Sequence, residues 1–138
     1  MKKTILFILF LLFSIKAIAQ EWVNDKNFDS VISQGAFDDD SEGIIVIEFW
    51  AEFNSANAFH DWEQINDLDG VEYYRCDVSQ SPQSKKKYRV RMVPTILIFA
   101  GDDAFIKFQA KAGLDLLCPV DVPKMKAAVE VVRRESQF

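Results

Sequence analysis

Few side chains in this sequence have the types and spacing that covalent chemistry requires. The 138 residues include two cysteines, Cys76 and Cys118, and a single histidine. Disulfide exchange needs a thiolate that attacks and a second thiol that resolves the mixed disulfide. Because these cysteines are far apart in the sequence and belong to different predicted elements, we expect them not to form a catalytic pair.

Serine hydrolysis and metal chemistry have equally little support. Ser55 would need a base, and His60 lies early on a predicted helix, where a surface or partly packed histidine is more typical than a catalyst. The acidic stretch over residues 38–42 lacks liganding oxygens at a recognised calcium-loop spacing, which favours a solvated turn. We therefore expect no catalytic residue of these kinds, no metal site and no cofactor.

The N-terminal segment has the pattern of a secretory signal peptide rather than that of a folded element. Lys2 and Lys3 precede an unbroken apolar run over residues 5–13, and Ala17-Ile18-Ala19 is the small-x-small pattern that signal peptidase accepts. The run is well short of the roughly 20 apolar residues of a membrane-spanning helix. We expect residues 1–19 to be removed from an exported protein, periplasmic or secreted, with no membrane span after cleavage.

The size and charge of the remaining chain limit the functions open to it. Removal of residues 1–19 leaves 138 − 19 = 119 residues, which suits one domain. It also removes three lysines, so that 16 − 3 = 13 basic side chains stand against 21 acidic ones, a formal net charge of −8. Nucleic-acid binding depends on basic side chains at phosphates, and this balance argues against it.

Hydrophobic periodicity predicts alternating helices and strands. The run over residues 44–51 is rich in β-branched and aromatic residues and is typical of a strand buried on both faces. Apolar residues then recur at helical spacing from Ala58 to Leu68. The other predicted elements are a helix from Asp25 that ends near Gly35, a strand over 71–78, a helix from Ser81-Pro82 through Tyr88, a hairpin of strands 96–99 and 105–108, and a helix that starts at Asp121 and Pro123.

This order, together with several local stretches, resembles the thioredoxin family. Residues 46–53 are similar to the family's strand into its active-site turn. The stretches similar to its second half are Asp77-Val78, Pro82, Lys87-Tyr88, Val90-Arg91 and Val93-Pro94-Thr95, followed by the hairpin. The resemblance covers roughly residues 21–132 and implies an α/β, thioredoxin-like fold with a central mixed sheet flanked by helices on both faces, and with residues 20–138 as one domain.

The sequence departs from the family where the Cys-x-x-Cys motif of its relatives stands. The positions after Phe53 read Asn54-Ser55-Ala56-Asn57, and an asparagine amide can neither attack a disulfide nor resolve one. We expect the polar side chains of this turn to cap the helix that follows. Glu48 matches the family's buried acid, which assists proton transfer, and Arg75 matches a basic residue on the neighbouring strand. A structural ion pair between Glu48 and Arg75 is therefore expected.

The resemblance also implies a peptide groove beside a loop with a cis bond before Pro94, whose backbone groups pair with an extended peptide. Met92 stands where the family commonly has glycine, and its bulk would narrow the groove or give it a soft apolar lip. The expected groove residues come from the turn and from this loop: Trp50, Phe53, Asn54, Ser55, Ala56, Asn57, Met92, Val93, Pro94 and Thr95.

Three functions remain open at this point. The leading one is an exported, redox-inert domain that binds extended or unfolded polypeptide, as a chaperone or adaptor does. Its partners would be exported or unfolded polypeptides, or a membrane or envelope protein complex. The alternatives are a thiol-disulfide oxidoreductase that uses Cys76 and Cys118, and a structural accessory subunit whose groove is unused. In the sheet order that the resemblance implies, the strand of Cys76 lies two strands from the one leading to Cys118.

Overall fold

The central strand of the fold is β2 (Ile44–Trp50), whose first six residues are buried because side chains cover both of its faces. The computed structural model describes residues 20–34, 43–101, 103–111 and 115–136. The predicted signal peptide, the acidic stretch and the helix end at Gly35 lie outside these residues.

One mixed sheet of five strands runs through the molecule in the order β1-β3-β2-β4-β5. Its remaining strands are β1 (Glu21–Val23), β3 (Val71–Asp77), β4 (Thr95–Ala100) and β5 (Asp103–Gln109). β1, β3 and β2 are parallel, whereas β4 is antiparallel to β2 and β5 to β4, which confirms the predicted hairpin. The sequence does not predict β1, because three residues carry too little of a period-two pattern.

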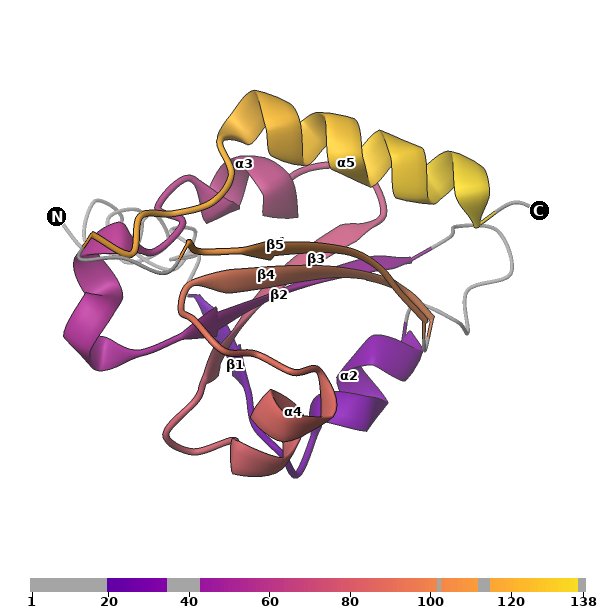
Figure 1. Cartoon of the computed structure of the whole chain (residues 1–138). Helices are drawn as coiled ribbons and strands as arrows, with labels where there is room; N and C mark the ends of the chain where they lie inside the picture. Colours follow the sequence, from indigo (N-terminus) through magenta and orange to yellow (C-terminus); the bar gives the residue numbers. More distant parts are fainter. Residues whose placement is uncertain (1–19, 35–42, 102, 112–114, 137–138) are drawn as a thin grey trace, which may run out of the picture.

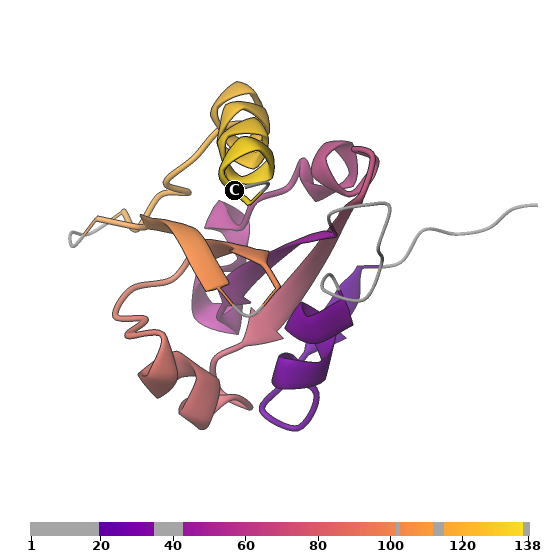
Figure 2. The ribbon, with the colours of Figure 1, turned by 90° about the vertical axis from the view of Figure 1, so that its right-hand side faces the viewer.

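Helices cover both faces of this sheet, as Figures 1 and 2 show. On one face lie α3 (Trp62–Asn66) and α5 (Val122–Glu135), and on the other lie α2 (Phe28–Gln34) and α4 (Pro82–Lys87). The arrangement confirms the predicted α/β fold with a central mixed sheet. Asp121 begins α5, because its Oδ1 accepts a hydrogen bond of 2.9 Å from the backbone N–H of Lys124.

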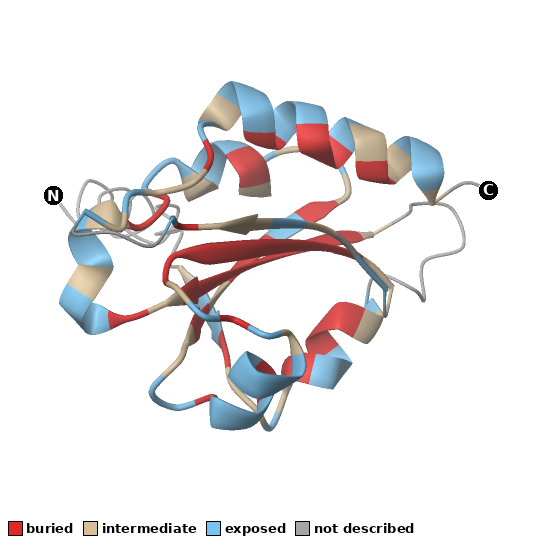
Figure 3. Cartoon of the chain, viewed as in Figure 1, coloured by how far each residue is buried: buried red, intermediate tan, exposed pale blue. Residues whose placement is uncertain are grey.

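Alternation along β2 divides the core into two layers. Ile45 and Ile47 pack in the layer of α2, whereas Ile44 and Val46 pack in the layer of α3 and α5. Figure 3 shows buried residues along β2 and β4 and on the sides of the helices that face the sheet. Glu48 comes next in the second set, so the alternation directs its carboxylate into the layer of α3 and α5.

The helix predicted from Ala58 to Leu68 is wrong in its extent. A 3-10 helix, η1 (Glu52–Asn57), comes first, and Ala58 is extended (φ −62°, ψ 160°), which separates η1 from α3. Phe59 lies between the two helices and stacks on Tyr73 with the ring centroids 5.8 Å apart. Burial of the Phe59 ring therefore outweighs the helical periodicity of the sequence.

Candidate functional site

The end of β2 and the beginning of β4 bring two loops together. Phe49 of β2 pairs with Thr95 of β4, so the turn after β2 and the loop before β4 leave the sheet at the same end. The turn forms η1, and the loop contains the Val93–Pro94 peptide bond, which is cis. Figure 1 shows η1 at this end of the sheet, near the chain between β5 and α5.

Asn54 ties three segments together with its side-chain amide. Its Nδ2 atom donates hydrogen bonds to Val93 O (2.9 Å) and to Leu116 O (3.0 Å). Asn57 supports it, because its Nδ2 donates to Asn54 Oδ1 (2.7 Å) and to Asp115 O (3.0 Å). We call these four hydrogen bonds the asparagine clasp. The clasp joins η1 to the cis-proline loop and to the segment that leads into α5.

The clasp takes the place of the predicted N-caps. The expectation that Asn54, Ser55 and Asn57 cap the next helix is wrong, because they lie inside η1. α3 begins after Asp61, whose side chain makes no cap hydrogen bond. Partly buried amides need hydrogen-bond partners, and the carbonyls of the neighbouring loops supply them here. The motif positions thus hold loops in place instead of starting a helix.

The segment before α5 has an uncommon backbone conformation at Leu116. Its φ of 38° lies in the left-handed region, which a leucine rarely occupies because of its Cβ atom. The carbonyls of Leu116 and of Asp115 both accept hydrogen bonds from the clasp. A strained residue persists where its surroundings over-determine it, and the clasp does so at Leu116.

The cis-proline loop uses its carbonyl groups within the chain. Val93 O accepts from Asn54, Pro94 O accepts from a backbone N–H after β5 (3.0 Å), and Met92 O accepts from Thr95 Oγ1. The expectation that this loop offers free backbone groups to a peptide is therefore not met for these three carbonyls. Contact with a partner at this loop would depend on side chains.

Large apolar side chains are exposed next to the clasp. Phe53 is 78% exposed and Leu117 is 63% exposed, and each is the direct neighbour of a clasp residue in the chain. Trp50 is half-buried, and its ring meets that of Trp22 edge to face with the centroids 5.0 Å apart. Phe53 and Trp50 were predicted as groove residues from the sequence, whereas Leu117 and Trp22 were not. An apolar Leu116-Leu117 pair inside a predicted loop was the available signal.

Glu48 is fully buried, and hydrogen-bond donors surround its carboxylate. The strand register places Glu48 opposite Arg75, whose Nε donates to Oε1 at 3.2 Å, so the predicted ion pair is present. The Tyr73 hydroxyl donates to the same oxygen (2.6 Å), and the backbone N–H of Phe59 donates to Oε2 (3.1 Å). Burial, and then the Glu48 carboxylate, raise the pKa of the Tyr73 phenol, which keeps it a donor.

The same ion pair explains where the predicted helix breaks. Arg75 Nη2 donates to Phe59 O at 2.9 Å, while the N–H of Phe59 goes to Glu48. Both backbone groups of Phe59 are therefore bound by side chains of β2 and β3 instead of by helical partners. This contact satisfies buried polar groups at the point where η1 and α3 separate.

The two cysteines lie in different surroundings. Cys76 is fully buried on β3, and burial raises its pKa to about 11. Burial also raises the pKa of Cys118, whose Sγ lies 3.3 Å from Val120 O. Both cysteines are free. The expectation that two strand steps separate the strand of Cys76 from the strand leading to Cys118 is wrong. Both β2 and β4 lie between β3 and β5, so the separation is three steps. A thiol with a raised pKa provides little thiolate near neutral pH.

The surroundings of the clasp include a pocket and the histidine. The pocket has a volume of about 640 Å³, and Leu117 and Cys118 contribute to its wall. His60 Nε2 lies 2.9 Å from Ala56 O, which ties the ring to the backbone of η1.

Within the described ranges, no three His, Cys, Asp or Glu side chains are grouped so that they could hold a metal ion. No helix in the described part of the chain is both long and apolar enough to cross a membrane.

Comparison with known proteins agrees on one family. The thioredoxin family model matches residues 19–118. Thioredoxin M2, chloroplastic, from Arabidopsis thaliana is 30% identical over an alignment of 86 residues that covers 59% of this chain and 42% of that relative. The chain therefore spans less than half of that relative's length.

Two solved structures have the same fold. A thioredoxin from Malassezia sympodialis is 19% identical with a TM-score of 0.60, over 86% of this chain and 96% of that one. A mutant thioredoxin from Halobacterium salinarum is 18% identical with a TM-score of 0.63, over 85% of this chain and 96% of that one. Likeness at these identities shows the fold alone.

Proposed function

Because the chain belongs to the thioredoxin family, we propose that it is an exported, redox-inert thioredoxin domain that binds extended or unfolded polypeptide. The observation that carries the proposal is the asparagine clasp. Both ends of the motif are amides, and both amides are committed to hydrogen bonds with backbone carbonyls and with each other. A site so arranged has no group that forms a mixed disulfide.

The surroundings of Glu48 support redox inertness as well. Glu48 matches the acid that assists proton transfer in the family. Here its two oxygens accept hydrogen bonds from Tyr73, Arg75 and a backbone N–H, and the guanidinium compensates its charge. The pair serves to hold the junction of η1 and α3 together. Its place in the family's proton pathway is thus filled by a structural contact.

Exposed side chains favour binding as the remaining activity. Phe53 and Leu117 are both largely exposed on a chain that otherwise buries most large apolar residues. Contiguous exposed apolar groups mark interaction sites, and we propose that Phe53 and Leu117 form one beside the clasp. We infer that a client chain lies across the clasp and contacts these two side chains, since the loop carbonyls are already paired. We expect binding through so few side chains to be weak.

Export and the nature of the partners rest on the sequence. The segment over residues 1–19 has the order of charged start, apolar run and small residues that signal peptidase accepts. An exported protein would meet unfolded chains that have just crossed the membrane, or a complex of the cell envelope. Fractionation of cells that express the full chain tests this part, with loss of residues 1–19 measured by mass spectrometry.

Thiol chemistry is the weaker alternative. Cys76 has a pKa raised to about 11 and no exposed surface, and three strand steps separate its strand from β5. A structural accessory subunit with an unused surface is the other alternative, and it differs from our proposal in leaving Phe53 and Leu117 without a client.

The experiment that tests the proposed function has two parts. We expect no dithiol-driven reduction of insulin above the uncatalysed rate, and turnover that Cys118→Ser abolishes would contradict redox inertness. We also expect an unstructured, uncharged 12-residue peptide with alternating apolar residues to bind in calorimetry. Phe53→Ser should weaken this binding about fivefold or more, because it removes exposed apolar contact area, whereas Phe53→Leu should retain most of it. Equal affinities for the two variants would contradict the proposed site.

A further inference from the structure

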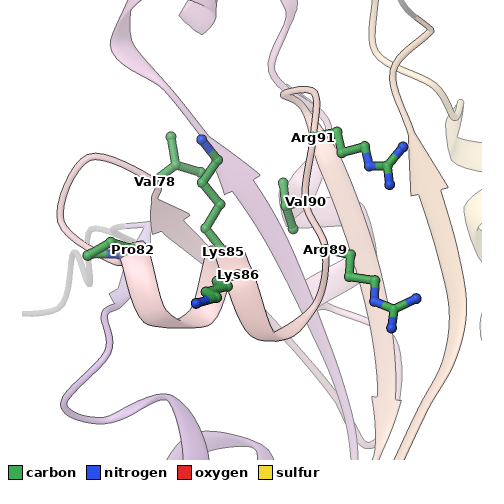
Figure 4. Close-up of a pocket in the computed structure, with 7 residues that line it drawn as sticks. All are labelled: Val78, Pro82, Lys85, Lys86, Arg89, Val90 and Arg91. Atoms are coloured by element: carbon green, nitrogen blue, oxygen red, sulfur yellow. The ribbon is translucent and has the colours of Figure 1, made fainter.

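A second surface of the protein concentrates positive charge. Lys85 and Lys86 of α4, together with Arg89 and Arg91 of the loop that follows, line an open pocket of about 600 Å³ (Figure 4). Val78 and Pro82 add apolar walls to it. We call this pocket the basic groove. Its lining residues include none of the residues of the asparagine clasp, and it was not predicted from the sequence.

The cations of the basic groove lack acidic partners among the described residues. All four side chains are exposed. The ion pairs between residues that the structure describes join Arg75 to Glu48, Lys87 to Asp29 and Arg133 to Glu130, and none includes a groove cation. The whole chain carries a formal net charge of −5, so a cluster of cations without acidic partners in the described part of the chain is not what its composition alone would produce.

Arg89 holds its charge at a position that favours glycine. Its φ of 53° is left-handed, and it closes the end of α4, where its N–H bonds to Lys86 O (3.2 Å) and the N–H of Val90 bonds to Lys85 O (3.0 Å). Glycine is the usual residue at this position of a helix terminus because it has no Cβ atom. An arginine here carries a conformational cost and, being exposed, recovers little packing energy.

Lys107 adds a fifth positive charge beside the groove. Its Nζ donates to Tyr88 O (3.1 Å) and to Arg89 O (2.9 Å), which holds the ammonium against the loop. Burial lowers its pKa, and the charges of Arg91 and Arg89 lower it further. Repulsion among these cations raises the free energy of the unbound protein, and a bound anion would relieve it.

The directions of the side chains distinguish an extended anion from a compact one. Figure 4 shows Lys85 and Lys86 on one side of Val90, and Arg89 and Arg91 extending in the same direction on the other side. The cations therefore do not converge on one point, as they would around a single phosphate. Carboxylates spaced along a chain could meet the two sides in turn. Arg91 also leads directly into Met92 and the cis-proline loop of the clasp site.

We propose that the basic groove binds an acidic segment of an extended polypeptide, whose neighbouring residues lie across the asparagine clasp. This inference rests on the proposed polypeptide-binding function and names the class of client: chains that carry aspartate or glutamate beside an apolar stretch. The apolar part contacts Phe53 and Leu117, and the acidic part is held by the groove cations.

Two labelled peptides test the inference by fluorescence anisotropy. One is the uncharged 12-residue peptide, and the other has the same sequence extended by four aspartates. At low salt we expect the acidic peptide to bind about tenfold more tightly, and added salt should remove this advantage because the charges are exposed. The double variant Arg89→Gln/Arg91→Gln should lose most of the advantage while its affinity for the uncharged peptide is unchanged.

Matched controls separate the groove from net charge and from folding. Lys126→Gln/Arg134→Gln removes two exposed charges of α5 and should leave the tenfold difference intact. Arg89→Gly relieves the left-handed backbone, so this variant should melt at a higher temperature and still bind the acidic peptide less tightly.

Each contrary outcome has a distinct meaning. If the uncharged peptide binds and the aspartates add nothing, the groove inference fails and the proposed function stands. If neither peptide binds, both fail. If the advantage survives Arg89→Gln/Arg91→Gln, or if tripolyphosphate alone binds as tightly as the acidic peptide, the groove is not a site for an acidic segment.

Discussion

The side-chain Nδ2 of Asn54 lies 2.9 Å from the carbonyl oxygen of Val93, although the two residues are 39 positions apart in the chain. The first belongs to the turn that carries the motif positions, and the second directly precedes the cis-proline. Where a reactive family member would keep a thiol free to attack, this chain has a donor that binds the facing loop. The contact makes the motif position a structural one.

Replacing Asn54 with aspartate tests whether donation by the amide is essential. The change keeps the shape of the side chain but places a carboxylate against the carbonyls of Val93 and Leu116. We expect a loss of about 2 kcal/mol in the free energy of unfolding. The two hydrogen bonds that the amide donates are lost, and a carboxylate oxygen then faces the two carbonyl oxygens. Chemical denaturation measures it. Ser55→Ala on the exposed side of η1 is the control and should cost little, and an equal loss in both variants would contradict the clasp.

A second substitution tests the buried ion pair. Glu48→Gln removes the charge opposite Arg75 and turns an amide toward the N–H of Phe59. We expect a loss of about 3 kcal/mol, since breaking one partner of a buried pair leaves the other uncompensated. Hydrogen exchange at Phe59 should accelerate as well. Glu52→Gln, at an exposed acid of η1, should change neither quantity. If Glu48→Gln unfolds no more easily than this control, the network is not structural.

Much of this architecture could be predicted, since it depends on local patterns. The apolar run of β2 and the hairpin of β4 and β5 are readable from periodicity, and Asp121 was recognisable as the start of α5. The pairing of Glu48 with Arg75 followed from the strand order that the family resemblance implied. What escaped prediction depends on contacts between distant residues. The hydrogen bond from Asn54 to Leu116, 62 positions away, leaves no signal in a short stretch of sequence. The same is true of the interruption of the helix at Ala58.

The cysteines should be slow to react in the native protein. With a pKa of about 11 instead of 9.0, the Cys76 thiolate at pH 8 is about 100-fold scarcer than that of an ordinary thiol. Burial raises the pKa of Cys118 in the same direction. Because thiolate increases as pH approaches the pKa, alkylation of Cys76 should rise about tenfold per unit between pH 8 and 10.

Mass spectrometry after treatment with iodoacetamide follows this reaction. Without reductant, the protein unfolded in urea should take up two labels, because both thiols are free. Complete labelling of the native protein within minutes at pH 7 would contradict the raised pKa values, and failure to label the unfolded protein would show a disulfide.

Restoring the motif tests whether the frame of the family is intact. Asn57 Nδ2 and Asn54 Oδ1 already lie 2.7 Å apart, so Asn54→Cys/Asn57→Cys places two thiols on side chains that meet. We expect this double variant to reduce insulin in the presence of dithiothreitol, and neither single variant to do so as fast. A folded double variant without activity would show that Met92 or the tied Glu48 closes the site to chemistry.

The most direct test of a redox-inert, polypeptide-binding site is a titration of the ¹⁵N-labelled protein with the uncharged extended peptide, followed by amide NMR signals. We predict progressive shifts at Phe53 and its neighbours in η1 and at Leu116 and Leu117, with the signals of α2 unmoved and with both cysteines still reduced at the end. Unmoved signals at η1 and at residues 115–117, at peptide concentrations that saturate other thioredoxin-fold binding domains, would contradict the account and leave an accessory subunit in its place.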